Sequence, residues 1–181
     1  MKDKITLGSG HLYYKEFTGT IPENETIETD ENRLGYISGG ATLEYKPTFY
    51  EAKDDLGIVV KTILTEEEAI LKSGIMTFNG KTLAVLCETG RVSEDTSKHI
   101  RTVKIGGTGN ANGKSYVIHF VHKDPVDGDI RVTIVGKNQA GFSLAFAKDK
   151  ETVIDAEFKA LPQDSEGTLI KYQEFDSTIT D

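Results

Sequence analysis

The sequence is poor in cysteine, proline and tryptophan, and it has no long apolar run. One cysteine, Cys87, in 181 residues excludes an internal disulfide and is typical of a protein made in a reducing cytosol. No stretch approaches the roughly 18 apolar residues of a membrane span, and the first residues lack the apolar segment of a secretory signal. Four prolines against 18 glycines favour a fold of strands and tight turns.

Charge is unevenly spread along the chain. The net charge of −8 argues against a protein that binds nucleic acid over its outer surface. Residues 149–181 carry nine acids and three lysines, whereas residues 98–137 carry seven lysines and arginines and three aspartates. Such opposed patches suit head-to-tail contact between copies, and scattered solvated charges explain them equally well.

Alternating apolar and polar residues predict strands along much of the chain, because period two places each apolar set on one face of a sheet. The expected strands are residues 12–17, 34–46, 58–65, 69–78, 100–105, 115–123, 130–136, 142–147 and 153–160. Short polar and glycine-containing segments at 127–129, 137–141 and 148–150 separate the later ones. These turns predict an antiparallel meander from about residue 114 to 174.

One helix is expected at about residues 79–89. Asn79 is a suitable N-cap, Leu83, Leu86 and Cys87 have helical spacing, and Gly90 ends the pattern. The spacing favours Cys87 as a buried structural thiol rather than a nucleophile. The predicted fold is one domain over residues 1–181, mainly β, an antiparallel β-sandwich or partly open barrel with a single flanking α-helix.

Two segments do not have the pattern of a compact core. Residues 18–32 read as an acidic linker. Residues 47–57 read as an extended loop between two long strands, where adjacent aromatics favour a contact surface over packing against the domain. The candidate contact residues in this loop are Phe49, Tyr50, Glu51, Lys53, Asp54 and Asp55.

A glycine-rich segment at residues 106–115 ends in Gly113-Lys114-Ser115, as a phosphate-binding loop does. That motif needs glycine where this chain has Thr108, and it needs a helix after the loop. Residues 115–122 are strand-like instead. A flexible glycine turn in a hairpin is therefore favoured, and no nucleotide site is predicted.

No other pattern predicts chemistry. His119 and His122 are three apart on an expected strand, so they face opposite sides and do not suit one metal ion. His11 and His99 have no companions at ligand spacing. The acids Asp54, Asp55 and 66–68 are typical of a solvated face, and no nucleophile elbow is present. We therefore expect no catalytic residue, cofactor or metal site, and no enzyme activity.

The chain resembles the major tail tube proteins of long-tailed phages and prophages of Gram-positive bacteria. The resemblance depends on the order of several segments from about residue 10 to 162 rather than on any single motif. These segments are GHLYYK (10–15), LGYI (34–37), GGATLEY (39–45), FYEAKDDLG (49–57), KSGIMT (72–77), GDIRVTIVG (128–136), AGFSLAFAKD (140–149) and EFKALP (157–162).

The resemblance implies a virion structural protein, made in the host bacterial cytoplasm, that self-assembles into stacked, hexameric rings. DNA would pass through the channel during ejection without specific binding. The other implied partners are the tape-measure, tail-tip and tail-terminator proteins. It also implies that residues 47–57 form the loop that reaches the neighbouring ring, with residues 1–10 and 175–181 as candidate arms.

Two alternatives remain open at this stage. One is a monomeric β-sandwich binding module that recognises carbohydrate or a host surface, although such modules often expose tryptophan and this chain has none. The other is a tube subunit of a contractile or type VI-like machine, which keeps the fold and the assembly. An acidic wall suits moving DNA in either tube, because like charge keeps phosphates from binding.

Overall fold

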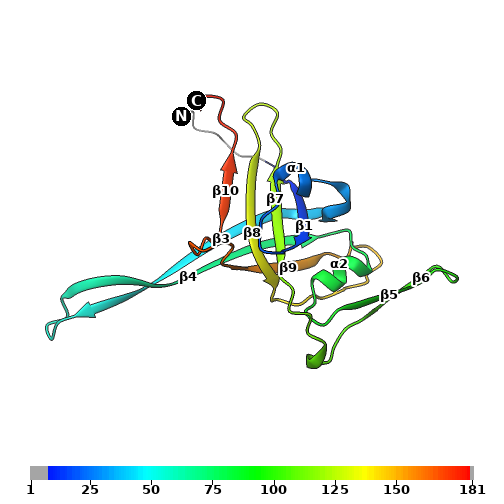
Figure 1. Ribbon diagram of the computed structural model, residues 1–181, viewed down its shortest axis with the longest axis horizontal. Helices are drawn as coiled ribbons and strands as arrows, with labels where there is room; N and C mark the ends of the chain where they lie inside the picture. Colours follow the sequence, from blue (N-terminus) through cyan, green and yellow to red (C-terminus); the bar gives the residue numbers. More distant parts are fainter. Residues whose placement is uncertain (1–7, 180–181) are drawn as a thin grey trace.

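The computed structural model describes residues 8–179, which form a mainly antiparallel β structure with short helices (Figure 1). The strands of the main sheet are β1 (His11–Glu16), β2 (Arg33–Gly35), β3 (Ile37–Lys53), β4 (Val59–Ile75), β7 (Tyr116–His122), β8 (Ile130–Asn138), β9 (Ile154–Leu161) and β10 (Lys171–Glu174). A separate hairpin consists of β5 (Arg91–Asp95) and β6 (Ile100–Lys104). The helical elements are α1 (Asn24–Ile27), α2 (Gly80–Val85) and two 3-10 turns, η1 (Asp30–Asn32) and η2 (Thr108–Asn110).

The main sheet curls round so that its two end strands are consecutive in the chain. Its order is β2-β1-β7-β8-β9-β4-β3, and only Tyr36 separates β2 from β3. The second half of β8 pairs with β9 and its first half pairs with β10. Among residues 8–179 no ladder joins β2 to β3. The fold is therefore a curled, open antiparallel sheet rather than a closed barrel, which confirms the predicted class.

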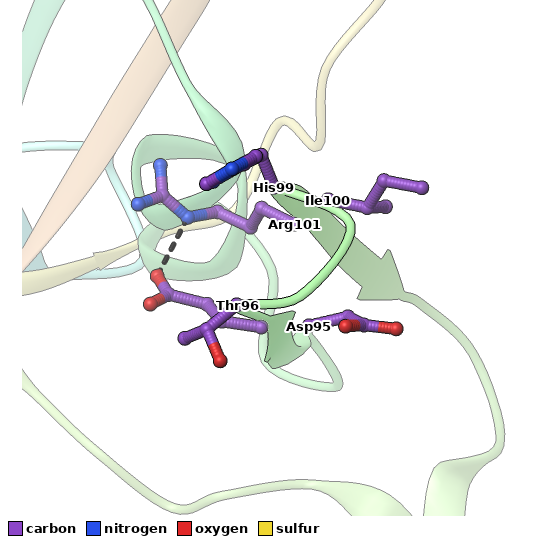
Figure 2. A pocket seen from close by; sticks show the side chains of 6 residues that line it. Asp95, Thr96, His99, Ile100 and Arg101 are labelled. Carbon is purple, nitrogen blue, oxygen red and sulfur yellow. Dashed lines mark hydrogen bonds and ion pairs between the residues drawn. The ribbon is translucent and has the colours of Figure 1, made fainter.

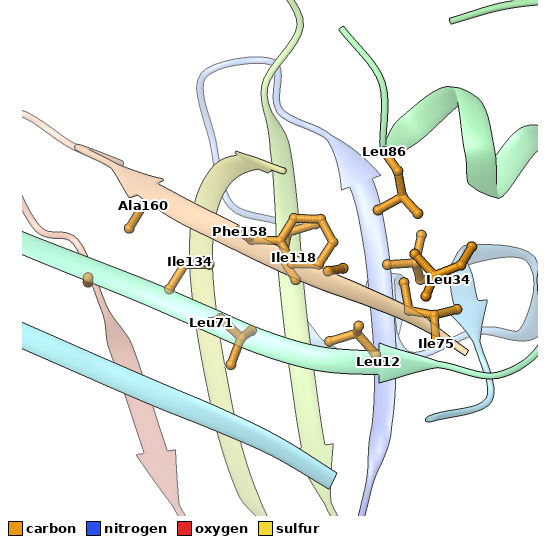
Figure 3. Packing of buried hydrophobic residues seen from close by; sticks show 12 residues of the cluster. Leu12, Leu34, Leu71, Ile75, Leu86, Ile118, Ile134, Phe158 and Ala160 are labelled. Carbon is orange, nitrogen blue, oxygen red and sulfur yellow. The ribbon is translucent and has the colours of Figure 1, made fainter. Parts of the chain in front are cut away.

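The main core lies inside this curl (Figure 3). Leu12, Leu71, Ile118 and Ile134 come from four different strands and are buried together. On β9 the predicted alternation is confirmed, since every second residue is buried from Ile154 onward. Phe158 from β9 is the largest fully buried side chain of this cluster. Period two thus provides one apolar face from each strand.

A second cluster covers the other face of β1, β7 and β8. Tyr13, Val117, Val121 and Val135 are buried there, and Ile27 from α1 covers them. The prediction that residues 18–32 form a linker is wrong at this point, because Ile27 is an anchor in the core. A single apolar residue in a four-residue helix is too short a pattern for sequence periodicity to reveal.

Helix α2 packs against the main core through Leu83, Val85 and the adjoining Leu86 (Figure 3). Asn79 caps it as predicted: its side chain accepts from the backbone N–H of Lys81 at 2.8 Å and of Thr82 at 3.2 Å. The Thr82 hydroxyl donates to the carbonyl of Leu34, which ties the helix to β2. The helix covers residues 80–85, shorter than the predicted 79–89, although Leu86 is buried as expected.

Several predicted strand boundaries are wrong. The two strands expected at 58–65 and 69–78 are one strand, β4, with a bulge opposite Thr48 and Phe49. Residues 142–147 form no strand, although Phe142 and Leu144 pack against the main core. The glycine-rich segment is not a hairpin turn, since it joins β6 to β7, which pair with different strands.

Candidate assembly surfaces

The most prominent surface feature is the outer part of the β3–β4 hairpin, which projects from one end of the molecule (Figure 1). We call residues 47–67 the distal arm. Its two strands pair with each other from Pro47 opposite Glu67 to Lys53 opposite Val59. Strand β9 pairs with β4 only at residues 70–75. Along both outer edges of the arm, the outward-facing backbone N–H and C=O groups therefore form no ladder with any other strand among residues 8–179.

The distal arm exposes apolar side chains on both of its faces. Phe49 lies opposite Leu64, and Tyr50 lies opposite Ile63. Because consecutive pairs in a ladder point to opposite faces, each face carries one of these apolar pairs. Phe49 is 54% exposed and Tyr50 is 60% exposed. One face could pack on the domain itself, but two exposed apolar faces favour contact with other molecules.

The tip of the distal arm is a well-defined turn. The Asp54 carboxylate accepts from the backbone N–H of Leu56 at 3.0 Å and of Ile58 at 2.8 Å. Gly57 closes the turn with φ of 80°, which suits glycine. Leu56 is left 85% exposed at the extreme end. The tip thus presents an apolar side chain on a fixed backbone.

The six predicted contact residues have different places in this arm. Phe49 and Tyr50 are exposed on opposite faces of β3 rather than in a loop, since residues 47–53 are strand. Glu51 and Lys53 form an ion pair at 3.5 Å on the strand surface. Asp54 is used within the turn, whereas Asp55 lies beside Leu56 at the tip.

Sequence reasoning missed the apolar residues on the returning strand. Val59, Ile63 and Leu64 on β4 are exposed, as is Ile58 just before it, although the alternation predicted a half-buried strand there. The sequence pattern gave no signal for this, because it predicted two shorter strands at 58–65 and 69–78. Only the structure shows that β3 and β4 have seventeen residues each and extend past β9.

A buried charged network holds α1 against the sheet. Arg131 Nε on β8 donates to Glu28 Oε1 at 2.6 Å, and His119 Nε2 on β7 lies 3.2 Å from the same oxygen. His119 Nδ1 lies 2.8 Å from the Thr133 hydroxyl. Because a carboxylate only accepts, the neutral His119 carries its proton on Nε2 and accepts from Thr133. The network therefore holds α1 in place over the second apolar cluster.

Burial and hydrogen bonds act against each other in this network. Burial lowers the pKa of His119, and the hydrogen bond to Glu28 only partly offsets it. Burial alone would raise the pKa of Glu28, but the hydrogen bonds from Arg131 and His119 outweigh it, so that the pKa of this carboxyl is lowered. Both ring nitrogens of His119 have side-chain partners within the subunit, and Glu28 joins α1 to β7 and β8.

The remaining candidates for chemistry are separated from one another. His122 Nδ1 lies 2.8 Å from the Ser9 carbonyl, on the opposite side of β7 from His119. Burial raises the pKa of the Cys87 thiol, which opposes activation as a nucleophile. Glu68 is ion-paired with Lys159. Within the described part of the chain, no group of three or more histidines, cysteines or acids suits a metal ion.

The second hairpin, β5–β6, projects from the opposite end of the molecule (Figure 1). An open hollow of about 520 Å³ lies at its turn, beside His99, Ile100 and Arg101 (Figure 2). The Asp95 carboxylate accepts from the backbone N–H of Ser97 and of Lys98, which fixes this turn. Strand β5 was not predicted, because its five residues alternate only weakly.

The predicted terminal arms are only partly described. Residues 1–7 of the arm at 1–10 and residues 180–181 of the arm at 175–181 lie outside the described residues. Phe175 N donates to the Asp129 carbonyl at 3.0 Å, so the second segment begins against the β7–β8 turn. No helix among residues 8–179 is long and apolar enough to cross a membrane.

No protein-family model matches the chain, and no curated protein sequence matches it.

Proposed function

We propose that this chain is the structural subunit of a phage tail tube. It assembles with its own copies into stacked, hexameric rings, and DNA passes through their channel during ejection. The observation that carries this proposal is the distal arm at the end of a well-packed domain, with two exposed apolar faces and outer edges that no other strand of residues 8–179 pairs. The ordered resemblance to tail tube proteins from residue 10 to 162 supports the same function.

Energetics support assembly through the arm. A two-stranded hairpin is at best marginally stable alone in water. Burying one large apolar side chain contributes roughly 1.5–3 kcal/mol. Contacts by Phe49, Tyr50 and Leu56 therefore offset much of the free-energy cost of association, which is the translational and rotational freedom that two copies lose when they bind. The role is structural rather than enzymatic, in keeping with the separation of the candidate catalytic groups.

The binding-module alternative has less support. A carbohydrate platform needs aromatic rings side by side on one surface, and Phe49 and Tyr50 point to opposite faces of the arm. The tube of a contractile or type VI-like machine keeps the same fold and assembly. It differs from this proposal only in the surrounding apparatus.

Negative-stain electron microscopy of the purified protein tests the proposal. We expect hollow rings or tubes of uniform diameter at high concentration across a salt series, with tail-tip proteins added as nuclei. Single particles under every condition, nuclei included, would overturn it and make the binding module the leading hypothesis.

A matched pair of variants links assembly to the arm. Tyr50→Glu should abolish tubes, because it buries a charge in a contact between copies. Phe146→Glu changes another exposed aromatic residue, in the loop between β8 and β9, and should assemble as the wild type does. Equal assembly of both variants would contradict a role for the arm.

A further inference from the structure

The β5–β6 hairpin has one covered face and one open face. A Cβ added at Gly80 would lie 2.7 Å from Val103 Cγ2 and 2.9 Å from Arg101 Cδ, so these two side chains lie against α2. Residues alternate between faces along a strand. Ile100 and Lys104 therefore point away from the helix, together with Arg91, which is paired opposite Lys104.

The open face carries an unfavourable pair of charges. Arg91 and Lys104 are direct cross-strand neighbours, and like charges placed opposite each other are destabilising. Arg91 donates to the Gly106 carbonyl at 3.1 Å. Among the described residues, neither cation forms an ion pair with a carboxylate, in contrast to Arg101, which is 2.8 Å from Glu94 (Figure 2). A carboxylate from outside the subunit would relieve this repulsion.

The opposite end of the molecule has the complementary charge. Residues 44–68, which contain the distal arm, carry seven acids and three lysines, a net of −4. Residues 81–114, which contain β5–β6, carry six lysines and arginines and three acids, a net of +3. Asp55 and the 85% exposed Leu56 lie at the tip of the arm. The 52% exposed Ile100 lies opposite Asp95 on the open face of β6, four residues along the strand from Lys104. Each end thus has one exposed apolar side chain, and the net charges of the two ends are opposite in sign.

We propose that the β5–β6 hairpin of one copy is the receptor for the distal-arm tip of the next copy. Asp55 would face the Arg91–Lys104 pair, and Leu56 would pack on Ile100. Because the two surfaces lie at opposite ends (Figure 1), the contact is heterologous, which is the type of contact that stacking requires. This inference rests on the proposed function, for which it names the receiving surface.

Charge exchange tests this contact. Lys104→Glu and Asp55→Lys each place like charges in the interface, so each should raise the concentration needed for tube formation at least tenfold, leaving rings without stacks. Lys104→Glu combined with Asp55→Lys in one chain restores opposite charges and should return that concentration to within threefold of the wild type. Lys150→Glu, in the loop before β9, is the control and should leave it unchanged. Thermal unfolding followed by circular dichroism checks that every variant is folded.

Disulfide trapping provides a second readout. In a Cys87→Ser background, Leu56→Cys combined with Ile100→Cys should give covalent ladders of the assembled subunit under mild oxidation. Each single cysteine variant should give dimers at most.

The outcomes separate this inference from the proposed function. Suppose that the wild type forms tubes but Lys104→Glu does not change the concentration needed for tube formation, or that the doubly exchanged chain does not restore it. Either result would overturn the receptor assignment and leave the proposed tube function standing. A wild type that forms no rings or tubes under any condition would overturn both.

Discussion

Replacing Glu28 by glutamine tests the contact that holds α1 on the sheet. The Glu28 side chain is 10% exposed, and one of its oxygens receives both Arg131 Nε and His119 Nε2. Glutamine keeps that oxygen but removes its charge. A charge-assisted hydrogen bond is worth about 1.5–3 kcal/mol against about 1 kcal/mol for a neutral one. With about 1 kcal/mol lost for each of the two bonds, Glu28→Gln should destabilise the protein by about 2 kcal/mol.

Urea unfolding at pH 7 measures this loss. Since the slope of the unfolding free energy is about 2 kcal/mol per molar urea for a small protein, the midpoint should fall by about 1 M. Glu25→Gln changes an exposed acid on the same helix and should shift stability by less than about 0.5 kcal/mol. Equal midpoints for Glu28→Gln and Glu25→Gln would refute the reasoning, because the charged hydrogen bonds of Glu28 would then contribute nothing to the stability of the fold.

Three further predictions follow from the core and its buried groups. Stability should fall as the pH is lowered below about 6.5, because burial lowers the pKa of His119 in the folded protein and the unfolded chain therefore binds the proton first. The difference between the urea midpoints at pH 7 and pH 5 should be smaller in His119→Gln than in the wild type. Phe158→Ala should cost about 3–5 kcal/mol in urea unfolding, because it empties the centre of the main core, and a loss below about 1 kcal/mol would contradict that placement. Alkylation of Cys87 by iodoacetamide at pH 7 should be slow in the native protein and fast in urea, since burial raises the thiol pKa; equal rates would place the thiol at the surface.

The elements that the sequence predicted well are those with a local cause. The cap at Asn79 requires only a side chain and the next three residues, and the alternation at residues 154–160 requires only one buried face. The strand expected at residues 142–147 has the same alternation, and Phe142 and Leu144 do pack on the core. It forms no ladder, because alternation indicates only a buried face, and a strand also needs a partner that pairs with its backbone.

The candidate contact surface was predicted only in part. Adjacent aromatics in a charged segment correctly indicated that Phe49 and Tyr50 are exposed. Their placement on opposite faces follows from their adjacency on strand β3, a segment that the sequence analysis assigned to a loop. The register between β3 and β4, with a bulge beside Phe49, sets only which residues they face, Leu64 and Ile63. The turn role of Asp54 likewise depends on the backbone at Leu56 and Ile58, which the sequence alone does not specify.

Hydrogen–deuterium exchange of the free subunit and of the assembled protein tests the central claim, that copies of this chain cover the distal arm. In the free subunit we expect fast exchange at the edge amides of residues 47–67, because no other strand among the described residues pairs with them. On assembly these amides should become strongly protected, while buried strands such as β7 and β8 change little. An arm that exchanges equally fast in both states would contradict the account, even if tubes form.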